Sequence, residues 1–355
     1  MKKTALVLSD ASSTHTWTWI KGYNYLGFKV YLLSFEEPIY SNIPLEDFIK
    51  INSKFKPSIK RYLFGLSKVK SYIQKISPDI IFAHFIPNYG LLSYLQGQKP
   101  FVLFCWGTDL IKVSFKSIFH KIISKRIFNA ARLIVVDAKF MKEIIEAKFK
   151  IESKKIIILP FGIEKNIRDK GANVKKENEK IILFTNRKLE KIYNPFIIID
   201  GLSKVNFENY KLIWIAKGSL EKKVKEMVYQ KGIFDKVEFF GFQERENLYK
   251  LLIKSDIYLS SSLYDGTSVS LLEAMNFGVF PIVSDILGNR EWILDGVNGF
   301  LFDPLNSDEL SFKIQEAIKN KILRERAIEI NRKIIETKAN WEENLKRFYE
   351  KIKDI

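Results

Sequence analysis

Short, continuously apolar runs recur along the chain, and stretches with helical spacing separate most of them. Continuous runs of β-branched and aromatic residues are typical of strands that helices cover on both faces. The runs in the first half are TALVLS, KVYLLS, DIIFA, FVLFC, LIVV and IIIL, and those in the second half are IILFT, KLIWIA, VEFF, IYLS and FPIVS. This alternation predicts an α/β fold with doubly wound parallel sheets.

The alternation of strands and helices occurs in both halves of the chain, and a chain of 355 residues suits two domains. Residues 160–180 are charged and poor in apolar side chains, so we interpret them as a linker and the approach to a second sheet. We therefore expect one Rossmann-like domain over residues 1–163 and another over 164–334. The last stretch, about 335–355, reads as a helix with Trp341, Leu345, Phe348 and Tyr349 on one side.

Composition narrows the class of protein. Cys105 is the single cysteine, so no internal disulfide forms, and the three histidines lie far apart with no cysteine partners, so no metal site is expected. The net charge of +17 is uneven: residues 1–165 carry 26 Lys and Arg against 12 Asp and Glu, and residues 166–355 carry 32 against 29. A basic first half indicates an anionic partner, phospholipid or nucleic acid, unless it reflects a lysine-rich proteome.

Ligands of doubly wound sheets bind beyond the carboxyl ends of the strands. In the first half, the candidate side chains at those ends are His15, His84, Trp106, Thr108 and Asp109, and in the second half they are Arg187, Lys188, Lys191 and Gly218. No G-x-G-x-x-G follows any predicted strand, so a nicotinamide or flavin cofactor is not indicated.

The stretch SSSLYDGTSVSLLEAMNFG, residues 260–278, reads as a loop and then a helix that Gly278 ends. Thr267 or Ser268 is a natural N-cap, and a helix N-terminus at a strand end suits a phosphate or diphosphate. Asp265 lies before that helix and Glu273 lies within it. Two acids on either side of a diphosphate site match a nucleotide sugar, which carries hydroxyls at both ends.

These residues resemble a known family. An acid, seven residues and a Glu, then A-M-x-x-G and GNREWILDGVNGFL, resemble the donor-binding region of retaining GT-B glycosyltransferases of family four. IIILPFGIE resembles the approach to the linker, and VEFFGFQERENLYKLLIKSDIYLSSS resembles the segment around the base pocket. PDIIFAHFIPNYGLL and WGTD resemble the acceptor half of a capsule or lipopolysaccharide subgroup. The resemblance implies two Rossmann-like domains facing across a cleft, with the final helix crossing back to the first.

The resemblance also assigns roles in the second half. Glu273 would bind the ribose hydroxyls. Asp265, which is shorter than the family's usual Glu, would bind the donor sugar. The amides of Gly266, Thr267 and Ser268 would contact the phosphate and sugar. Gly218 and Phe242 fall in segments expected to line the donor pocket. The alternatives are a solvated helix face for Glu273 and an ordinary loop or capping acid for Asp265.

A nucleoside diphosphate leaving group needs cations or a metal. The chain lacks the metal-binding pattern D-x-D, so we expect no metal and no other cofactor. Arg187 matches the family's arginine. Lys191 or Lys188 would supply the second positive charge, unless each is merely a surface residue. Many relatives carry histidine where Trp106 stands. Retention can proceed by front-face attack without a strong protein base, which leaves Asp109, His84, His15, Trp106 and Thr108 to orient the acceptor.

Residues 110–128, LIKVSFKSIFHKIISKRIF, read as a helix with an apolar stripe and lysines beside it, and FKPSIKRYLFGLSKVKSYIQKI is similarly basic and apolar. Such stripes either pack into a core or dock on an anionic leaflet. We expect a cytoplasmic glycosyltransferase, peripherally associated with the inner face of the membrane, that moves a sugar from a UDP-sugar to a glycan or lipid-linked glycan. The alternatives are a nucleotide-sugar epimerase or hydrolase of the same fold, and a basic nucleic-acid-binding protein.

Overall fold

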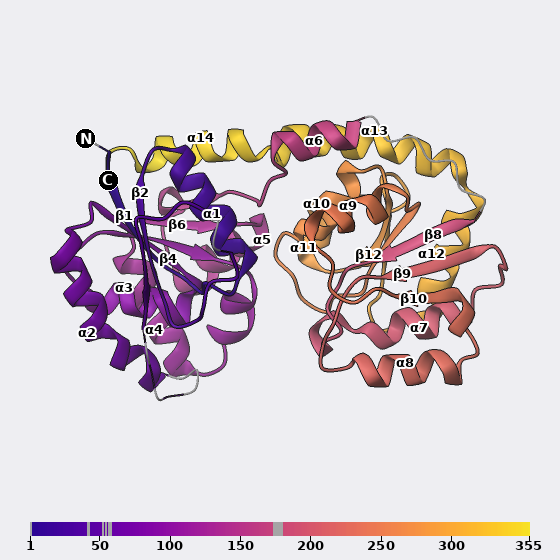
Figure 1. Ribbon diagram of the computed structural model, residues 1–355, viewed down its shortest axis with the longest axis horizontal. Coiled ribbons are helices and arrows are strands. Elements are labelled where there is room, and N and C mark those ends of the chain that lie inside the picture. The colour runs from indigo at the N-terminus through magenta and orange to yellow at the C-terminus, as the bar shows by residue number, and fades with distance from the viewer. Residues whose placement is uncertain (1, 41–42, 52, 54, 56–58, 173–179) are drawn as a thin grey trace. The chain divides into compact units, whose positions relative to one another are not determined.

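The computed structural model describes residues 2–40, 43–51, 53, 55, 59–172 and 180–355 (Figure 1). Parts of two predicted segments, residues 56–58 of the upstream basic stretch and 173–179 of the predicted linker, lie outside the described residues. The chain forms two compact units. The first contains Met1–Leu159 and Leu345–Ile355, and the second contains Pro160–Asn344.

The first unit is built on a parallel sheet in the order β3-β2-β1-β4-β5-β6-β7. Its strands are β1 (Thr4–Leu8), β2 (Lys29–Ser34), β3 (Asp47–Lys50), β4 (Ile80–His84), β5 (Phe101–Cys105), β6 (Leu133–Val136) and β7 (Ile156–Ile158). Its helices are α1 (Thr14–Tyr25), α2 (Ile59–Ile76), α3 (Leu91–Gln96), α4 (Ile118–Ala130), α5 (Lys139–Ile144) and the end of α14 (Trp341–Ile352). Short π-helical turns follow β4 (Phe85–Gly90) and β5 (Asp109–Val113).

Each face of this sheet has its own core. Strand residues such as Ile81 and Leu103 pack in one apolar cluster with residues of α2, α3, α4 and α5. On the other face, Trp19 of α1 lies 4.7 Å from Phe104 and 5.3 Å from Phe348 between ring centroids. Phe348 of α14 is fully buried there, so the end of the chain completes the core of the first unit.

The second unit is built on a parallel sheet in the order β10-β9-β8-β11-β12-β13. Its strands are β8 (Ile181–Thr185), β9 (Tyr210–Trp214), β10 (Val237–Phe239), β11 (Ile257–Ser260), β12 (Phe280–Ser284) and β13 (Phe300–Phe302). Its helices are α6 (Lys165–Ala172), α7 (Pro195–Ser203), α8 (Glu221–Gln230), α9 (Arg245–Ile253), α10 (Val269–Asn276), α11 (Leu287–Arg290), α12 (Ser307–Lys319), α13 (Lys321–Lys338) and the start of α14. One core contains residues of α7, α8 and α12, and the other contains residues of α6, α9, α10 and α13.

Every predicted apolar run forms a strand, so the predicted α/β fold with doubly wound parallel sheets is confirmed. Two edge strands were not predicted. β3 has only two apolar residues between the charged Asp47 and Lys50, and β13 is apolar throughout but has only three residues. Edge position alone does not account for this, because β7 and β10 are also edge strands and were predicted.

Two helical predictions need correction. Residues 110–128 do not form one continuous helix, because Ser117 is extended with φ −156° and caps a separate helix that starts at Ile118. Residues 335–355 span the end of α13 and all of α14. In α14, Trp341, Leu345 and Phe348 are buried as predicted, but Tyr349 is 40% exposed. No helix among the described residues is long and apolar enough to span a bilayer.

Candidate active site

The loops that follow β8 and β11 in the second unit are joined by hydrogen bonds. Ser261 Oγ donates to the carbonyl of Tyr193 at 2.7 Å, and the Leu263 amide donates to the carbonyl of Ile192 at 2.8 Å. These strands are neighbours in a parallel sheet, so their carboxyl ends meet at one edge. The bonds therefore bring the segment around Arg187 against the stretch of residues 260–268.

Arg187 is held from three directions. Its Nη2 donates to Asp265 Oδ2 at 2.5 Å, its Nη1 donates to Ser268 Oγ at 3.0 Å, and its guanidinium lies 4.4 Å from the ring centroid of Tyr193. The side chain is 11% exposed. Burial favours the neutral form of the guanidinium, but the Asp265 carboxylate outweighs it and raises the pKa of Arg187. Arg187 is thus a fixed cation at the edge of the sheet, and the structure pairs it with Asp265.

Helix α10 begins beside this ion pair. Ser268 is its N-cap and accepts a hydrogen bond from the Leu271 amide, and Gly278, with φ +66°, follows its end. Both predicted helix signals are confirmed. Thr267 and Ser268 are each 5% exposed. The start of the helix is thus capped by a side chain that also binds Arg187.

A close backbone approach fixes the loop in front of α10. A Cβ on Gly288 would lie 2.3 Å from the carbonyl oxygen of Gly266 and 2.7 Å from that of Asp265. No side chain fits there, so only glycine lets the start of α11 pack on this loop. Gly218 is under the same constraint, because a Cβ added there would lie 2.3 Å from the carbonyl oxygen of Leu189.

Glu273 is a buried carboxylate in α10, with 6% of its surface exposed. Tyr249 donates its hydroxyl to Glu273 Oε1 at 2.8 Å, and Arg245 Nη2 donates to the same oxygen at 3.3 Å. Burial raises the pKa of Glu273, and Arg245 and Tyr249 oppose that rise. The alternative of a solvated helix face is therefore wrong. A carboxylate buried at this cost suits a ligand-binding role.

The remaining second-unit candidates lie on the surface. Lys188 and Lys191 are both exposed, so burial does not distinguish them as the second cation. Phe242 is 73% exposed and follows Gly241, whose φ is +67°. Between Arg187 and Gly218, Glu190 accepts hydrogen bonds from the amide and hydroxyl of Ser219 at 2.7 and 2.6 Å.

In the first unit, the ends of β1, β4 and β5 bring three of the predicted acceptor residues together. The Trp106 indole stacks near His15 and His84, with centroid distances of 6.1 and 5.4 Å. His84 is 2% exposed and Nε2 lies 3.0 Å from the Tyr23 hydroxyl. Burial lowers the pKa of His84 to about 3, so the imidazole is neutral at physiological pH. Thr108 lies partly buried in the turn after β5.

Asp109 is fully buried below these residues. Its Oδ2 accepts from the Ile86 amide at 3.1 Å, and its Oδ1 accepts from the Trp106 and Leu110 amides at 3.0 Å each. Burial raises the pKa of Asp109 to about 6, against the effect of these hydrogen bonds. Its contacts favour holding the turns after β4 and β5 together over direct contact with an acceptor.

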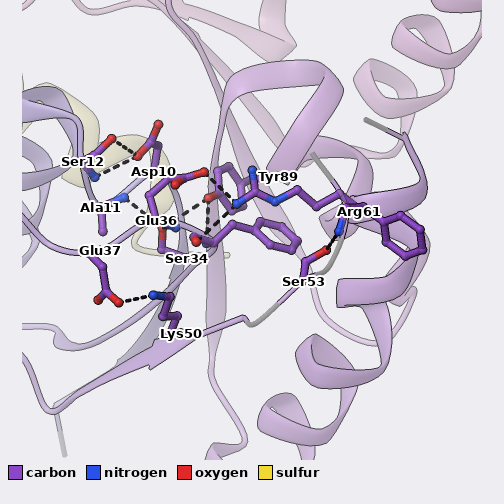
Figure 2. A network of polar contacts seen from close by, with 12 residues as sticks. Asp10, Ala11, Ser12, Ser34, Glu36, Glu37, Lys50, Ser53, Arg61 and Tyr89 are labelled. Carbon is purple, nitrogen blue, oxygen red and sulfur yellow. Dashed lines mark hydrogen bonds and ion pairs between the residues drawn. The ribbon is translucent and has the colours of Figure 1, made fainter. Parts of the chain in front are cut away.

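A second polar network ties the turns after β1 and β2 (Figure 2). Ser34 Oγ accepts from the amides of Ala11 and Glu36, both at 3.0 Å. Arg61 of α2 donates to Glu36 Oε1 at 2.7 Å, and its guanidinium lies 4.5 Å from the Phe35 ring centroid. These contacts hold the turns after β1 and β2 together at the carboxyl edge of the first sheet.

In the second unit, four residues at the carboxyl edge of the sheet were not predicted: Tyr193, Arg245, Tyr249 and Gly288. Arg245 and Tyr249 are four residues apart, which places both on one side of α9, and Arg245 Nε donates to the Tyr249 hydroxyl at 2.6 Å. That spacing is a readable signal, whereas the contacts of Tyr193 and Gly288 come from distant segments. Within the described part of the chain, no group of three or more His, Cys, Asp or Glu could hold a metal ion.

Comparisons with known proteins agree with this architecture. Residues 165–334 match the family described as glycosyl transferases group 1, and residues 5–138 match glycosyl transferase 4-like. An uncharacterized glycosyltransferase of Methanocaldococcus jannaschii, MJ1178, is 26% identical over 331 residues, covering 90% of this chain and 88% of the relative. The lipopolysaccharide 1,6-galactosyltransferase of Salmonella typhimurium is 24% identical over 76% of this chain and 74% of its own length.

A solved structure extends the likeness to the whole fold. Anabaena Alr3699/HepE in complex with UDP-glucose superimposes with a TM-score of 0.79, at 16% identity, over 99% of this chain and 100% of that one. At that identity the likeness concerns the fold, which is GT-B in its two Rossmann-like units. The two family matches show that this chain belongs to the group 1 glycosyltransferases, and the structural likeness shows that it has the GT-B fold.

Proposed function

We propose that this protein transfers a sugar from a UDP-sugar to a glycan or lipid-linked glycan acceptor, with retention of configuration and without a metal. The observation that supports it most is the fixed Arg187 guanidinium beside the capped start of α10, with Glu273 buried in the same helix. Among similar proteins, one is a lipopolysaccharide galactosyltransferase and another was solved with UDP-glucose. The enzyme would work in the cytoplasm at the inner face of the membrane.

The proposed residues divide the donor between them. Arg187, with Lys188 or Lys191, would neutralise the diphosphate, Glu273 would accept from the ribose hydroxyls, and the amides near Ser268 would face the phosphate. In front-face attack, the acceptor oxygen bonds to the anomeric carbon as the bond from that carbon to the phosphate oxygen breaks. The acceptor proton passes to the departing phosphate oxygen, so no protein base is required. A positioned cation lowers this barrier because negative charge develops on the leaving group.

A thermal-shift panel with UDP-, GDP-, ADP- and CMP-sugars in EDTA tests this function. We expect a UDP-sugar to stabilise the wild type, and Glu273→Ala to lose most of that shift. Incubating the donor with and without a glycan acceptor then separates transfer from hydrolysis or epimerisation, and NMR of the product reports the anomeric configuration. Stabilisation by none of the nucleotide sugars, or only with divalent metal, would contradict the proposal.

Tyr249→Phe is expected to weaken UDP-sugar binding about threefold to tenfold at pH 7.5, because Glu273 loses a hydrogen bond to its charged form. That hydrogen bond opposes the raised pKa of Glu273, so its loss raises the pKa further. Donor binding, which needs the carboxylate, should then fail at a higher pH as the solution is acidified. Titration of donor affinity against pH checks this, with the exposed Tyr229→Phe as control. An unshifted pH profile would show that Tyr249 is only structural.

A further inference from the structure

Helix α4 of the first unit carries large apolar side chains in solvent. Ile118 is 72% exposed, Phe119 58% and Ile122 46%, and Phe115, just before the helix, is 39% exposed. We call these four residues the α4 surface. The opposite side of the helix already fills the core through Ile127 and Phe128, which are fully buried. The α4 surface therefore does not belong to the core, and clustered exposed apolar side chains of this size mark an interaction site.

The stretch of sequence that carries this surface contains almost no negative charge. Residues 48–136 contain fifteen Lys and Arg and two acids, Asp79 and Asp109. Asp109 is buried among backbone amides, and Asp79 accepts from the Thr4 amide at 2.6 Å. On and beside α4, Lys116, Lys125 and Arg126 are exposed. The partner of the α4 surface must therefore be anionic as well as apolar.

These two properties select among partners. A second copy of the chain would bring like charges together, which costs free energy. A nucleic acid would satisfy the cations, but the aliphatic side chains of Ile118 and Ile122 offer no flat face for base stacking. An anionic bilayer satisfies both, because apolar side chains enter the boundary of the acyl chains while lysine and arginine stay among the headgroups.

We infer that the α4 surface docks this protein on an anionic phospholipid bilayer. The inference rests on the proposed function, since a lipid-linked acceptor is reached only at a membrane, and it names the part of the chain that makes the contact. Ile118 and Phe119 insert from the first turn of α4, and Lys116 and Lys125 bind headgroups. Ser117 caps that turn and accepts from the His120 amide, so both apolar side chains project from a formed helix.

Co-sedimentation with vesicles tests this surface. We expect the wild type to bind vesicles of phosphatidylcholine with about one-third phosphatidylglycerol and to leave pure phosphatidylcholine largely unbound. Ile118→Ser with Phe119→Ser should lower the partition coefficient at least tenfold. Leu305→Ser with Phe312→Ser, which are 80% and 58% exposed in the second unit, is the matched control and should stay within twofold of the wild type.

Substituting two lysines tests the electrostatic part of vesicle binding independently. Lys116→Gln with Lys125→Gln should weaken vesicle binding about fivefold to tenfold at low salt and less at high salt, whereas Lys222→Gln with Lys321→Gln should not. The inference fails if the wild type ignores anionic vesicles, binds neutral vesicles equally, or loses nothing in the Ile118 and Phe119 variant. It also fails if duplex DNA binds as tightly as the vesicles and competes with them.

The proposed function is judged separately on the same samples by the UDP-sugar thermal shift. Vesicle binding without any response to nucleotide sugars would contradict the proposed function and leave the docking surface in place. A UDP-sugar response without vesicle binding would overturn the docking surface alone. Unfolding temperatures of the variants show whether each one is folded, and the two pairs of substitutions make the test independent of either pair.

Discussion

Arg187→Ala is expected to lower the rate of sugar transfer by about two to three orders of magnitude, the effect of removing one preorganised donor from a developing negative charge. The guanidinium is held by Asp265, Ser268 and Tyr193, so it needs no reorganisation when the diphosphate departs. Arg187→Lys keeps the charge but loses the planar fork that spans two partners, so it should recover only part of the rate. Steady-state kcat and KM for transfer measure both effects.

Removing Arg187 also leaves Asp265 without its cation in a partly buried position. The double variant Arg187→Ala with Asp265→Asn therefore serves as a control, because it removes both charges and separates lost catalysis from lost folding. Lys188→Ala and Lys191→Ala test the second cation, and the variant with the larger loss of rate identifies it. A rate for Arg187→Ala within tenfold of the wild type would contradict the role given to this residue.

The strands that lie inside each sheet could be predicted from sequence because helices cover both their faces. IILFT and IYLS, which form β8 and β11, are continuously apolar for that reason. β3 and β13 were not predicted, because β3 has only two apolar residues between two charged ones and the three residues of β13 are too short a run to distinguish a strand from a loop. Register and sheet order are likewise set by pairing between distant segments.

The candidate site divides in the same way. Local rules placed the N-cap at Thr267 or Ser268 and the helix stop at Gly278, and the structure has both features. The pairing of Arg187 with Asp265 joins residues 78 positions apart, and the packing of Gly288 on Gly266 joins helix α11 to a separate loop. No local signal encodes such contacts. The burial of Glu273 likewise depends on α9, which supplies Tyr249 and Arg245.

The break after residue 113 shows how periodicity alone misleads. Residues 110–128 keep an apolar spacing that fits one helix packed on a core, yet Ser117 starts a new helix and turns Ile118 and Phe119 to solvent. Serine is a strong N-cap residue, and it offered a local signal for that break. The interruption moves Ile118 and Phe119 to the surface, whereas Ile127 and Phe128 of the same segment stay in the core.

Asp109→Ala is expected to destabilise the protein by about 2–5 kcal/mol, because the buried amides of Ile86 and Trp106 lose this acceptor and the Leu110 amide keeps only the Gly107 carbonyl. Asp109→Asn should cost less, about 1–3 kcal/mol, since one amide oxygen can still serve two of the donors while its NH₂ group faces the third. Urea unfolding followed by tryptophan fluorescence measures both. Asp79→Asn is the matched control, because Asp79 is exposed and accepts from the Thr4 amide, and it should change stability by less than about 1 kcal/mol.

The stability difference between the wild type and Asp109→Asn should also depend on pH, in a direction set by the burial of Asp109. The pKa of Asp109 is raised from 3.8 to about 6 in the folded protein, so the folded state holds this proton more tightly than the unfolded chain does. The stabilising contribution is complete below pH 3.8 and is lost as the pH rises through about 6. The gap in unfolding free energy between wild type and Asp109→Asn should therefore be wider at pH 4.5 than at pH 7.5. A gap that stays constant or widens with pH would show that the three amide hydrogen bonds outweigh burial and keep Asp109 ionised throughout.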